Sequence, residues 1–565
     1  MRRRVRRSGV TINAVAGNHV VMLGLNIDNS LRRGLRGFAI RRTDVAAEET
    51  FWMRGQKTFK SLEPTPAAGE QFSSREHPFQ SFQWSDYSAK PDQEYTYEVI
   101  ALYGKPAALE ERHSASVTVR TEPVVGADHT IFFNRGSPAT QEYARRFLNK
   151  WPSKVGQAAY DWLSRGLVEG ICDFIARAKN ERWSLKGAFY EFQWPSVLDA
   201  FGEAKKRGVK VSIVFDDIDN PTGPHQKNED AIEAEKLKSV TIPRTNGTLM
   251  HNKFIVLSEN NKPRAVLFGS TNLTENGLYG HANCAHIVED EDVAEKYLTF
   301  YEKLREDPET STQVSDYKHW TIEQTPAPAK KFSNGMAAVF SPRADLDALG
   351  WYAEMATAAK KGLFMTFAFG MNEQFRNVYS TDDDILRMGL MEKEWNGANK
   401  EKQIAAIRKL QARPNVVIAV GNRIPLSEFD QWLGELERIT GHVNVHWIHT
   451  KFALIDPLSN DPVVITGSAN FSDASTKTND ENMLVIKKNK RVADIYLGEF
   501  MRLHSHYAFR QAVKIFLEQN PGKSPDDFAQ RFLVEDKDED WTKSYFDRDD
   551  RQARMTRRLY FAGDS

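Results

Sequence analysis

Cysteine and long apolar runs are both scarce in this 565-residue chain. Cys172 and Cys284 are the two cysteines, too few for a disulfide framework or a cysteine-based zinc site, so we expect both to be small buried side chains. No stretch approaches the roughly 20 apolar residues of a membrane-spanning helix. No apolar segment follows the first arginines, as it would in a secretory signal. We therefore expect a soluble, cytoplasmic protein, which leaves export by a signal-independent route open.

An excess of charge is also lacking, because 76 basic and 76 acidic side chains cancel. The whole-protein field therefore gives no attraction to a polyanion or a membrane surface. One local exception is Met1–Arg7, "MRRRVRR", with five arginines in seven residues. We interpret it as a solvated basic tail, with contact to phosphate or anionic lipid as the alternative.

The first 125 residues have the pattern of a β-sandwich. Four stretches alternate with period two and are separated by Gly, Pro and Asp: "LRGFAIRRTD", "SFQWSDYSA", "EYTYEVIALYG" and "SASVTVRTE". The segment "PDQEYTYEVIAL" resembles the tyrosine-bearing late strand of fibronectin type III domains. We predict a fibronectin type III-like sandwich over residues 1–125.

From Val124 onward, helical patterns alternate with short apolar strands, which is typical of α/β units. The same order of elements occurs twice, over residues 126–320 and 331–565, and the second copy ends in a helical tail. The Pro-Ala stretch Thr321–Lys330 separates the copies. The predicted fold is thus multidomain, with a β-sandwich followed by two copies of one α/β unit.

The two copies agree most closely in their polar residues. His251 and Lys253 are matched by His449 and Lys451, and "GSTN" at 269–272 is matched by "GSAN" at 467–470. In both copies 21 residues separate the His from the last Asn. A His-x-Lys pair on a strand points both side chains to one face. Imidazole, ammonium, hydroxyl and amide groups together suit a tetrahedral phosphate, the last two from Ser270, Asn272, Ser468 and Asn470.

These residues carry a resemblance to a known family. "HTKFALID", His449–Asp456, followed by "GSAN", resembles the HxKxxxxD and GSxN signature of the phospholipase D superfamily, and "HNKFIVLS" with "GSTN" resembles a degenerate copy of it. The resemblance implies two α/β sheets packed about a pseudo-twofold axis, with both motifs at one site. It implies metal-independent phosphodiester cleavage through a covalent phosphohistidine, with no cofactor.

Two asymmetries distinguish the copies. Ser258 stands where the second copy has Asp456, and Asn283 stands where it has Glu481. In the family, an acid at the Glu481 position can hold a catalytic His from behind, and a carboxylate partner raises the pKa of an imidazole. We therefore expect Glu481 to support His449.

That expectation assigns the catalytic roles. His251 would be the neutral nucleophile, with Asn283 as a supporting amide, and His449 the protonated general acid. The alternative is that the first copy has decayed into a structural unit. Against this, the first copy keeps its His, Lys, Ser and Asn.

Other candidates receive structural interpretations. His442 and His446 lie near His449 at spacings that suggest a metal site, but no second cluster of ligands accompanies them, and we predict no metal. Asp216 and Asp217 end a strand and are at most rim residues. The aromatic clusters that hold Trp194 and Phe369 are expected to be core, with a substrate-facing role as the alternative.

The resemblance implies a phosphodiester substrate, and three functions remain open. Two motifs in one chain are similar to the lipid enzymes of that family, whereas many of its bacterial nucleases carry one motif per chain, and this favours a phospholipid phosphodiesterase or phosphatidyl transferase. The alternative is a metal-independent nuclease, favoured by the arginines at the start and the missing export signal. The third is a non-catalytic binding protein, in which the sandwich or the Arg-rich start contacts a partner or a membrane surface.

Overall fold

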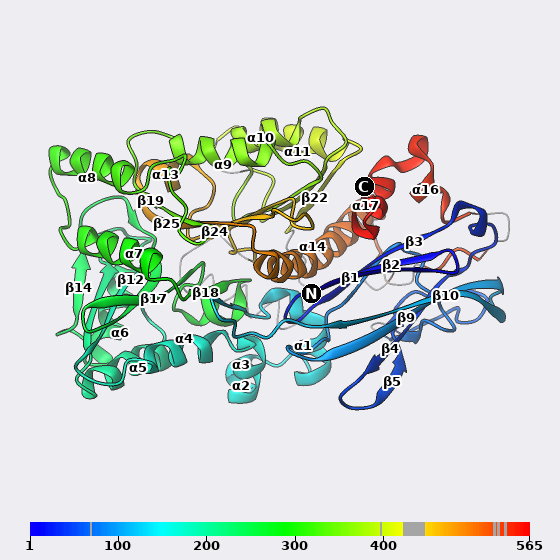
Figure 1. Cartoon of the computed structure of the whole chain (residues 1–565), viewed down its shortest axis with the longest axis horizontal. Coiled ribbons are helices and arrows are strands. Elements are labelled where there is room, and N and C mark those ends of the chain that lie inside the picture. The colour runs from blue at the N-terminus through cyan, green and yellow to red at the C-terminus, as the bar shows by residue number, and fades with distance from the viewer. Residues whose placement is uncertain are drawn as a thin grey trace.

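The computed structural model describes residues 1–67, 70–395, 398–421, 447–523, 527, 532–535 and 540–564. Figure 1 shows three parts: strands of the N-terminal 125 residues on the right, one α/β unit at the lower left and a second α/β unit above it. The predicted multidomain order of a sheet-rich region followed by two α/β repeats is confirmed. Among the described helices, none combines the length and apolarity needed to cross a membrane.

Two four-stranded antiparallel sheets form the N-terminal part. Their inner faces share one apolar core that includes Ile12, Leu23, Tyr97 and Val117. All four alternating stretches of the sequence contain strands. The sheets have the orders β1-β2-β3-β8 and β10-β9-β4-β5, from β1 (Arg2–Arg7), β2 (Val10–Ala16), β3 (Val21–Ile27), β8 (Gln83–Asp86), β10 (Ala108–Arg120), β9 (Glu94–Lys105), β4 (Gly37–Asp44) and β5 (Glu49–Trp52).

The first α/β unit is built on a seven-stranded mixed sheet. Its middle strands are almost wholly apolar and buried, as expected for a sheet covered on both faces. Its order is β11-β18-β17-β16-β12-β13-β14, from β11 (His129–Phe133), β18 (Cys284–Val288), β17 (Lys262–Gly269), β16 (Lys253–Glu259), β12 (Trp183–Phe189), β13 (Lys210–Asp216) and β14 (Thr241–Arg244). Its helices are α4 (Leu167–Ala176), α5 (Pro195–Lys206), α6 (His225–Ala234), α7 (Glu291–Leu304) and α8 (Ser311–Gln324).

The second α/β unit repeats this strand order. Its strands are β19 (Met336–Ser341), β25 (Asn479–Lys487), β24 (Val463–Gly467), β23 (Phe452–Ile455), β20 (Gly362–Phe367), β21 (Leu386–Met391) and β22 (Val416–Val420). Its helices include α9 (Asp347–Thr357), α10 (Glu373–Tyr379), α11 (Lys400–Gln411), α13 (Asp473–Lys477) and the long α14 (Lys490–Gln519). One extra strand, β15 (Leu249–Met250), comes from the first unit and pairs with β25.

The arginine-rich start is an edge strand and not a solvated tail, so that expectation is wrong. Residues Arg2–Arg7 form β1, which pairs with β2. Arg2 donates to Asp494 at 2.7 Å, Arg4 pairs with Asp564 and Arg6 pairs with Asp28 at 2.7 Å. Three of the five arginines are thus ion-paired, and Arg2 fastens the strand to α14 of the second unit.

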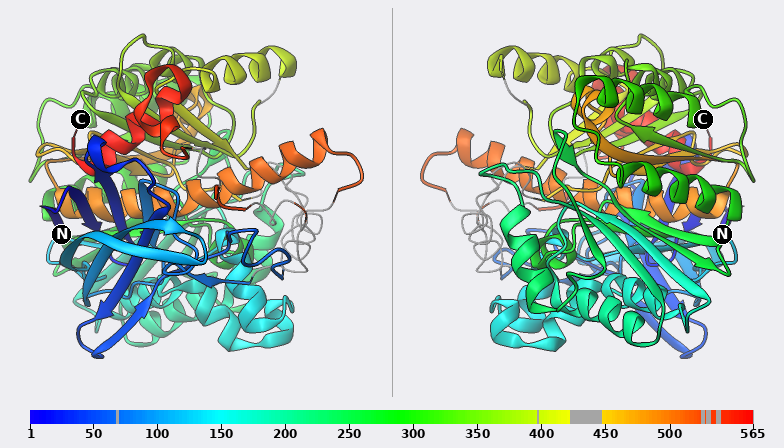
Figure 2. Two further views of the ribbon diagram at one scale, coloured as in Figure 1. Left: turned by 90° about the vertical axis from the view of Figure 1, so that its right-hand side faces the viewer. Right: turned by 90° about the vertical axis from the view of Figure 1, so that its left-hand side faces the viewer.

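The C-terminal tail packs on the sandwich although it follows the second α/β unit in sequence. Helices α16 (Lys543–Phe546) and α17 (Arg548–Ala562) lie beside the N-terminal strands in both views (Figures 1 and 2). A Cβ atom on Gly24 of β3 would lie 1.9 Å from the carbonyl oxygen of Phe561, so only glycine permits this crossing. The tail therefore joins the first and last parts of the chain.

Candidate active site

The two His-x-Lys motifs are brought together by backbone pairs that cross between the α/β units. His251 follows β15, and its N–H donates to Asp480 O of β25 at 3.0 Å. In return, the N–H of His449 donates to Ala282 O, just before β18, at 3.2 Å. Each histidine is thus placed at the start of the other unit's strand, and the two rings lie 6.2 Å apart between centroids.

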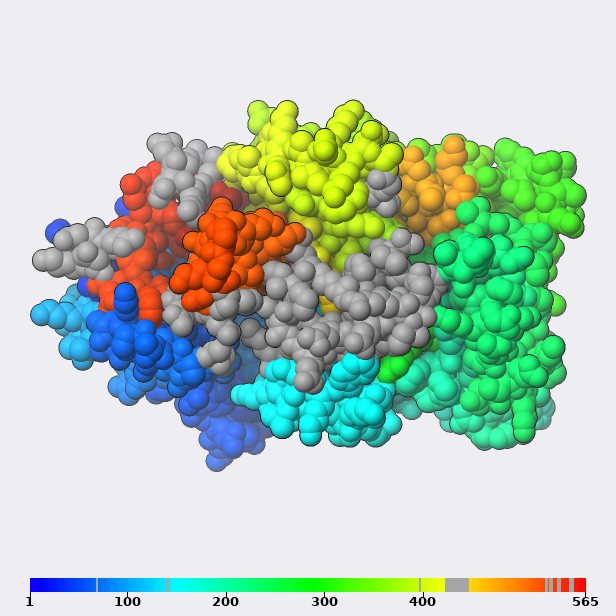
Figure 3. Space-filling view, turned by 180° about the vertical axis from the view of Figure 1, so that it is seen from behind, coloured from blue at the N-terminus to red at the C-terminus, as the bar shows by residue number. Residues whose placement is uncertain are grey.

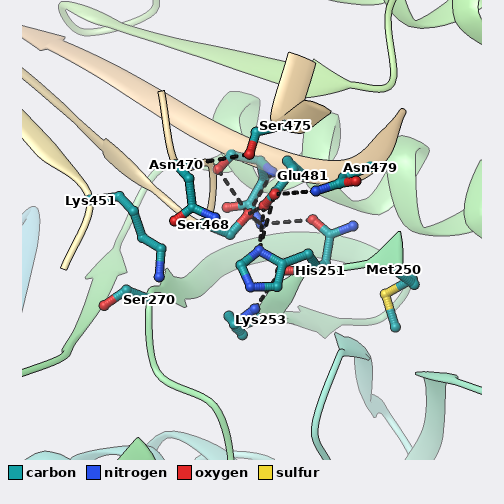
Figure 4. A network of polar contacts seen from close by, with 12 residues as sticks. Met250, His251, Lys253, Ser270, Lys451, Ser468, Asn470, Ser475, Asn479 and Glu481 are labelled. Atoms are coloured by element: carbon teal, nitrogen blue, oxygen red, sulfur yellow. Dashed lines mark hydrogen bonds and ion pairs between the residues drawn. The ribbon is translucent and has the colours of Figure 1, made fainter. Parts of the chain in front are cut away.

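The crossing decides which acid or amide meets which imidazole. Nδ1 of His251 contacts both carboxylate oxygens of Glu481, at 3.0 and 2.9 Å (Figure 4). Nδ1 of His449 contacts Oδ1 of Asn283 at 2.9 Å and the carbonyl oxygen of Ser270 at 3.0 Å. The expected support of His449 by Glu481 is therefore wrong, because Glu481 belongs to the strand that receives His251.

The serines of the two GSxN segments orient these partners. Ser468 Oγ donates to Glu481 at 2.6 Å, and Ser270 Oγ donates to Asn283 Oδ1 at 2.9 Å. Asn283 Nδ2 in turn donates to Gly277 O at 2.8 Å, which fixes the amide with its oxygen toward His449. From the sequence we expected these hydroxyl groups to donate to a bound phosphate. In the structure they set the Nδ1–H tautomer of each ring, which makes Nε2 the lone-pair nitrogen.

Burial controls the protonation of both rings. His251 and His449 are only 5% and 6% exposed. Burial lowers the pKa of His251 to about 4, against the opposing effect of Glu481. Burial and the neighbouring Lys451 lower the pKa of His449 well below its ordinary value. Burial raises the pKa of Glu481, but its interaction with His251, the charge of Lys253 and the hydrogen bond from Ser468 outweigh that effect and leave the pKa lowered. These shifts favour neutral imidazoles beside an ionised Glu481.

The two lysines supply the positive charge of the site. Lys253 Nζ donates to His251 O and Lys451 Nζ donates to His449 O, both at 2.6 Å, so each ammonium lies beside its own histidine. Burial lowers the pKa of Lys253 to about 7 and that of Lys451 well below its ordinary value. An anion bound here would favour the charged forms of both lysines and would replace the water they have lost.

Each GSxN glycine is required by a close backbone approach. A Cβ atom on Gly269 would lie 2.2 Å from Cys284 O, and one on Gly467 would lie 2.1 Å from Asn482 O. Only glycine lets the end of β17 or β24 pass this close to the next strand. The close passage places Ser270 and Ser468 beside the residues that they orient.

The asparagines of the motif lie at the same site. Asn272 hydrogen-bonds to Glu191, a carboxylate that sequence reasoning missed. Burial raises the pKa of Glu191, against the effect of Lys253. Its neighbour Tyr190 packs against the ring of His251 at 5.3 Å between centroids. The sequence analysis considered "FYEFQW" only for its aromatic residues. The position of Glu191 just after a buried strand was the signal that could have identified it. Asn470 lies in the second unit, where its N–H donates to Ser475 Oγ at 3.1 Å.

Asp456 and Ser258 lie away from the reacting groups. Seven residues of extended chain separate each from its histidine, which is roughly 20 Å. Asp456 accepts hydrogen bonds from the backbone N–H groups of Lys360, Lys361 and Gly362, the turn before β20. Ser258 is buried on β16 opposite Ser184, and no described residue hydrogen-bonds to its Oγ. The asymmetry between them therefore concerns the stability of the sheets and not the chemistry.

Asp216 positions the backbone next to His251 and is therefore more than a residue at the rim of the site. Its Oδ2 accepts the N–H of Met250 at 2.8 Å and so holds β15, the strand that leads into His251. Burial raises the pKa of Asp216 to about 7. Trp194 packs against Tyr160 and Tyr279, as expected for core.

The remaining sequence candidates have different outcomes. Phe369 lines a groove of about 900 Å³ that also reaches Asn470. His442 and His446 lie outside the described residues. Among described side chains, Asp217, His225 and Glu229 come close enough together to be metal ligands, but Glu229 is exposed and the other two are partly exposed.

Comparison with known proteins identifies the two halves of the site. The family model described as "Cardiolipin synthase, PLD-like domain" matches residues 171–305 and 391–504, which contain the first and second motif respectively. No curated protein matches the chain. Among solved structures, the chain is similar to phosphatidylserine synthase of Haemophilus influenzae Rd KW20, with 13% identity over 66% of this chain and 94% of that one and a TM-score of 0.43.

Two further solved structures are similar over smaller parts. Polyphosphate kinase of Porphyromonas gingivalis has 11% identity over 58% of this chain and 43% of that one, with a TM-score of 0.37. Nuc of Salmonella typhimurium, a phospholipase D family member, has 25% identity over 25% of this chain and 86% of that one, with a TM-score of 0.22. The matched family domain covers both HxK…GSxN segments, and these two regions of the chain therefore belong to the phospholipase D superfamily of enzymes.

Proposed function

We propose that this protein is a phosphodiesterase that acts through a covalent phosphohistidine, with His251 as the nucleophile and His449 as the general acid. The observation that carries the proposal is the pair of imidazoles 6.2 Å apart, each with Nδ1 held by a partner from the other unit and Nε2 left for the substrate. Lys253, Lys451, Asn272 and Asn470 would bind the non-reacting phosphate oxygens.

The reaction proceeds in two balanced steps. The lone pair on Nε2 of His251 forms a bond to phosphorus while the bond to the leaving oxygen breaks, and that oxygen takes the Nε2 proton of His449. Water then attacks phosphorus and gives a proton to His449, and the P–N bond returns its electron pair to His251. With an alcohol in place of water, the same second step is a transfer.

His251 keeps the role of nucleophile for a reason opposite to the one the sequence suggested. In the intermediate, the phosphorylated ring carries a positive charge, and the carboxylate of Glu481 accepts its Nδ1–H at 2.9 Å. Asn283 and the carbonyl of Ser270 offer His449 only neutral acceptors. His449 needs its charge only until it gives up the proton, and the anionic substrate favours that charge.

The favoured substrate is a phospholipid, either hydrolysed or used for phosphatidyl transfer. Its support is the description of the matching family model, which names a cardiolipin synthase. Nucleic acid stays the second candidate because of the groove that reaches Asn470: it is lined by Arg376, Lys402, Lys409 and Arg413 against two acids. The ion-paired N-terminal arginines remove one argument for a nuclease.

We also propose several structural details that the sequence predicted. The reciprocal pairing of His251 with β25 and of His449 with the chain before β18 supports a pseudo-twofold axis between the units. Four other expectations stay predictions. They are the fibronectin type III resemblance, the domain ranges 1–125, 126–320 and 331–565, contact of the sandwich with a partner or membrane, and a cytoplasmic location.

The substrate is tested by incubating the purified chain, with EDTA present, with phosphatidylcholine vesicles, single- and double-stranded DNA, and bis(p-nitrophenyl) phosphate. Choline release without DNA cleavage is the expected result, and the reverse pattern would establish the nuclease. A His449→Ala variant as active as the wild type on all of them would contradict the proposed chemistry.

The roles are tested with bis(p-nitrophenyl) phosphate, whose leaving group needs little help from an acid. His449→Asn should release about one equivalent of nitrophenolate and then stall as the phosphoenzyme, because the second step lacks its base. His251→Asn should give no burst. A burst from His251→Asn, or an adduct mapped to His449, would reverse the assignment.

A further inference from the structure

A second cavity lies far from the catalytic histidines, where three distant parts of the chain meet. It has a volume of about 360 Å³ and is lined from β8 of the sandwich, from α14 and from the C-terminal α16 and α17. Figure 3 shows these C-terminal helices, in red, between the blue sandwich and the yellow second unit. A volume of this order suits a small organic molecule.

The charge of the lining is one-sided. Arg557, Arg558 and His504 line the cavity, and the described lining residues include no carboxylate. Arg558 is already engaged: its Nε donates to Tyr545 O at 3.0 Å and its guanidinium lies 3.8 Å over the ring of Phe546. No carboxylate among the described residues pairs with Arg557, and burial lowers the pKa of that guanidinium. A partly buried cation without a counter-charge is costly unless an anion accompanies it.

His504 adds a buried polar atom without a partner. The side chain is 3% exposed and stacks on Phe500 at 5.6 Å, and no described residue hydrogen-bonds to its Nε2. The other ring nitrogen bonds to the backbone of Val417. Burial, with Arg557 adding to it, lowers the pKa of His504 to about 3, so the ring is neutral and Nε2 is an acceptor. Because His504 is neutral, the guanidinium groups of Arg557 and Arg558 carry the positive charge of the lining, which fits an anionic ligand.

We propose that this cavity is an accessory site for a small phosphate monoester, separate from the active site. Arg557 contacts the phosphate oxygens through charge-assisted hydrogen bonds. Trp84 and Tyr545 provide the aromatic wall for the organic part. A ligand here would touch the sandwich, α14 and α17 at once and so stabilise their association. Nothing in this inference depends on the catalytic proposal.

Isothermal titration of the full chain with phenyl phosphate tests it, with inorganic phosphate and phenol as further probes. Arg557→Gln should lower the number of bound phenyl phosphates by one, or weaken that binding by about tenfold or more, because a charged hydrogen bond is lost. Arg554→Gln is the matched control, since Arg554 is on the same helix but outside the lining. Thermal unfolding should show a rise in Tm with phenyl phosphate that Arg557→Gln loses.

The outcomes separate this site from the catalytic one. Loss of binding in His251→Asn with full binding in Arg557→Gln would assign all phosphate to the active site and overturn the proposal. Equal binding of phenol would overturn the role of the phosphate. Inorganic phosphate bound as tightly as phenyl phosphate would support the anion contact and overturn the role of the aromatic wall. Arg557→Gln serves as the main variant because His504→Gln, in a buried position, would also perturb folding.

Discussion

Replacing Glu481 by Gln removes a charge from the site while keeping a side chain of the same shape. The Gln oxygen can still accept the Nδ1–H of His251, which the carboxylate contacts at 2.9 Å. Two unit charges about 4 Å apart interact by about 4 kcal/mol at an effective dielectric constant near 20. If about half of the ring's charge has developed in the transition state, the loss is about 2 kcal/mol, or roughly 30-fold in rate.

The assay is the nitrophenolate burst from bis(p-nitrophenyl) phosphate in a rapid-quench experiment, which reports formation of the phosphoenzyme whatever the natural substrate. The burst rate of Glu481→Gln should fall by this factor. Ser468→Ala is the control, because it removes a hydrogen bond to the carboxylate at 2.6 Å but leaves the charge. A burst rate of Glu481→Gln within about threefold of the wild type would refute the argument that Glu481 stabilises a positive phosphohistidine.

Three further predictions concern other parts of the same framework. Asp216→Asn should flatten the pH dependence of the free energy of unfolding, measured with urea. In the wild type, the pKa of Asp216 in the folded state is about 7 and lies above its unfolded value. The wild type should therefore lose up to about 4 kcal/mol of stability as the pH rises from 4 to 7. Asp456→Ala should lower stability by about 2 to 3 kcal/mol without changing the burst rate per folded molecule, because three backbone donors lose their acceptor, whereas Ser258→Ala should cost little. Asn283→Asp should raise the pKa of His449 and move the alkaline limb of the pH–rate profile upward, and an unmoved profile would contradict its role as the acid.

Local spacing was enough to predict most of the architecture. Alternation with period two marked the strands of the sandwich, and the repeated order of helices and strands marked the two α/β units. The site residues His251, Lys253, His449 and Lys451 were found because the same polar pattern recurs at the same spacing. These sequence patterns could be interpreted without the structure, because each one depends only on the geometry of a short stretch of chain.

The pairing of site residues could not be predicted in the same way. Glu481 is close to His449 in sequence, and that closeness suggested a contact within one unit. In the structure, β15 leaves the first unit and joins β25, so Glu481 meets His251, and Asn283 meets His449 by the reciprocal crossing. Glu191 was missed for the same reason, because Glu191 follows β12 whereas its partner Asn272 follows β17.

Sequence alone determined that two copies of one HxK…GSxN motif exist in this chain and which functional groups their side chains offer. Tertiary structure decided which partner holds each histidine, that Asp456 supports a turn instead of the site, and that the basic N-terminal strand is tied to Asp494, Asp564 and Asp28. The physical reason is that residue type and spacing are local properties, whereas the protonation of a buried imidazole depends on groups that only the packing of two sheets brings within 3 Å.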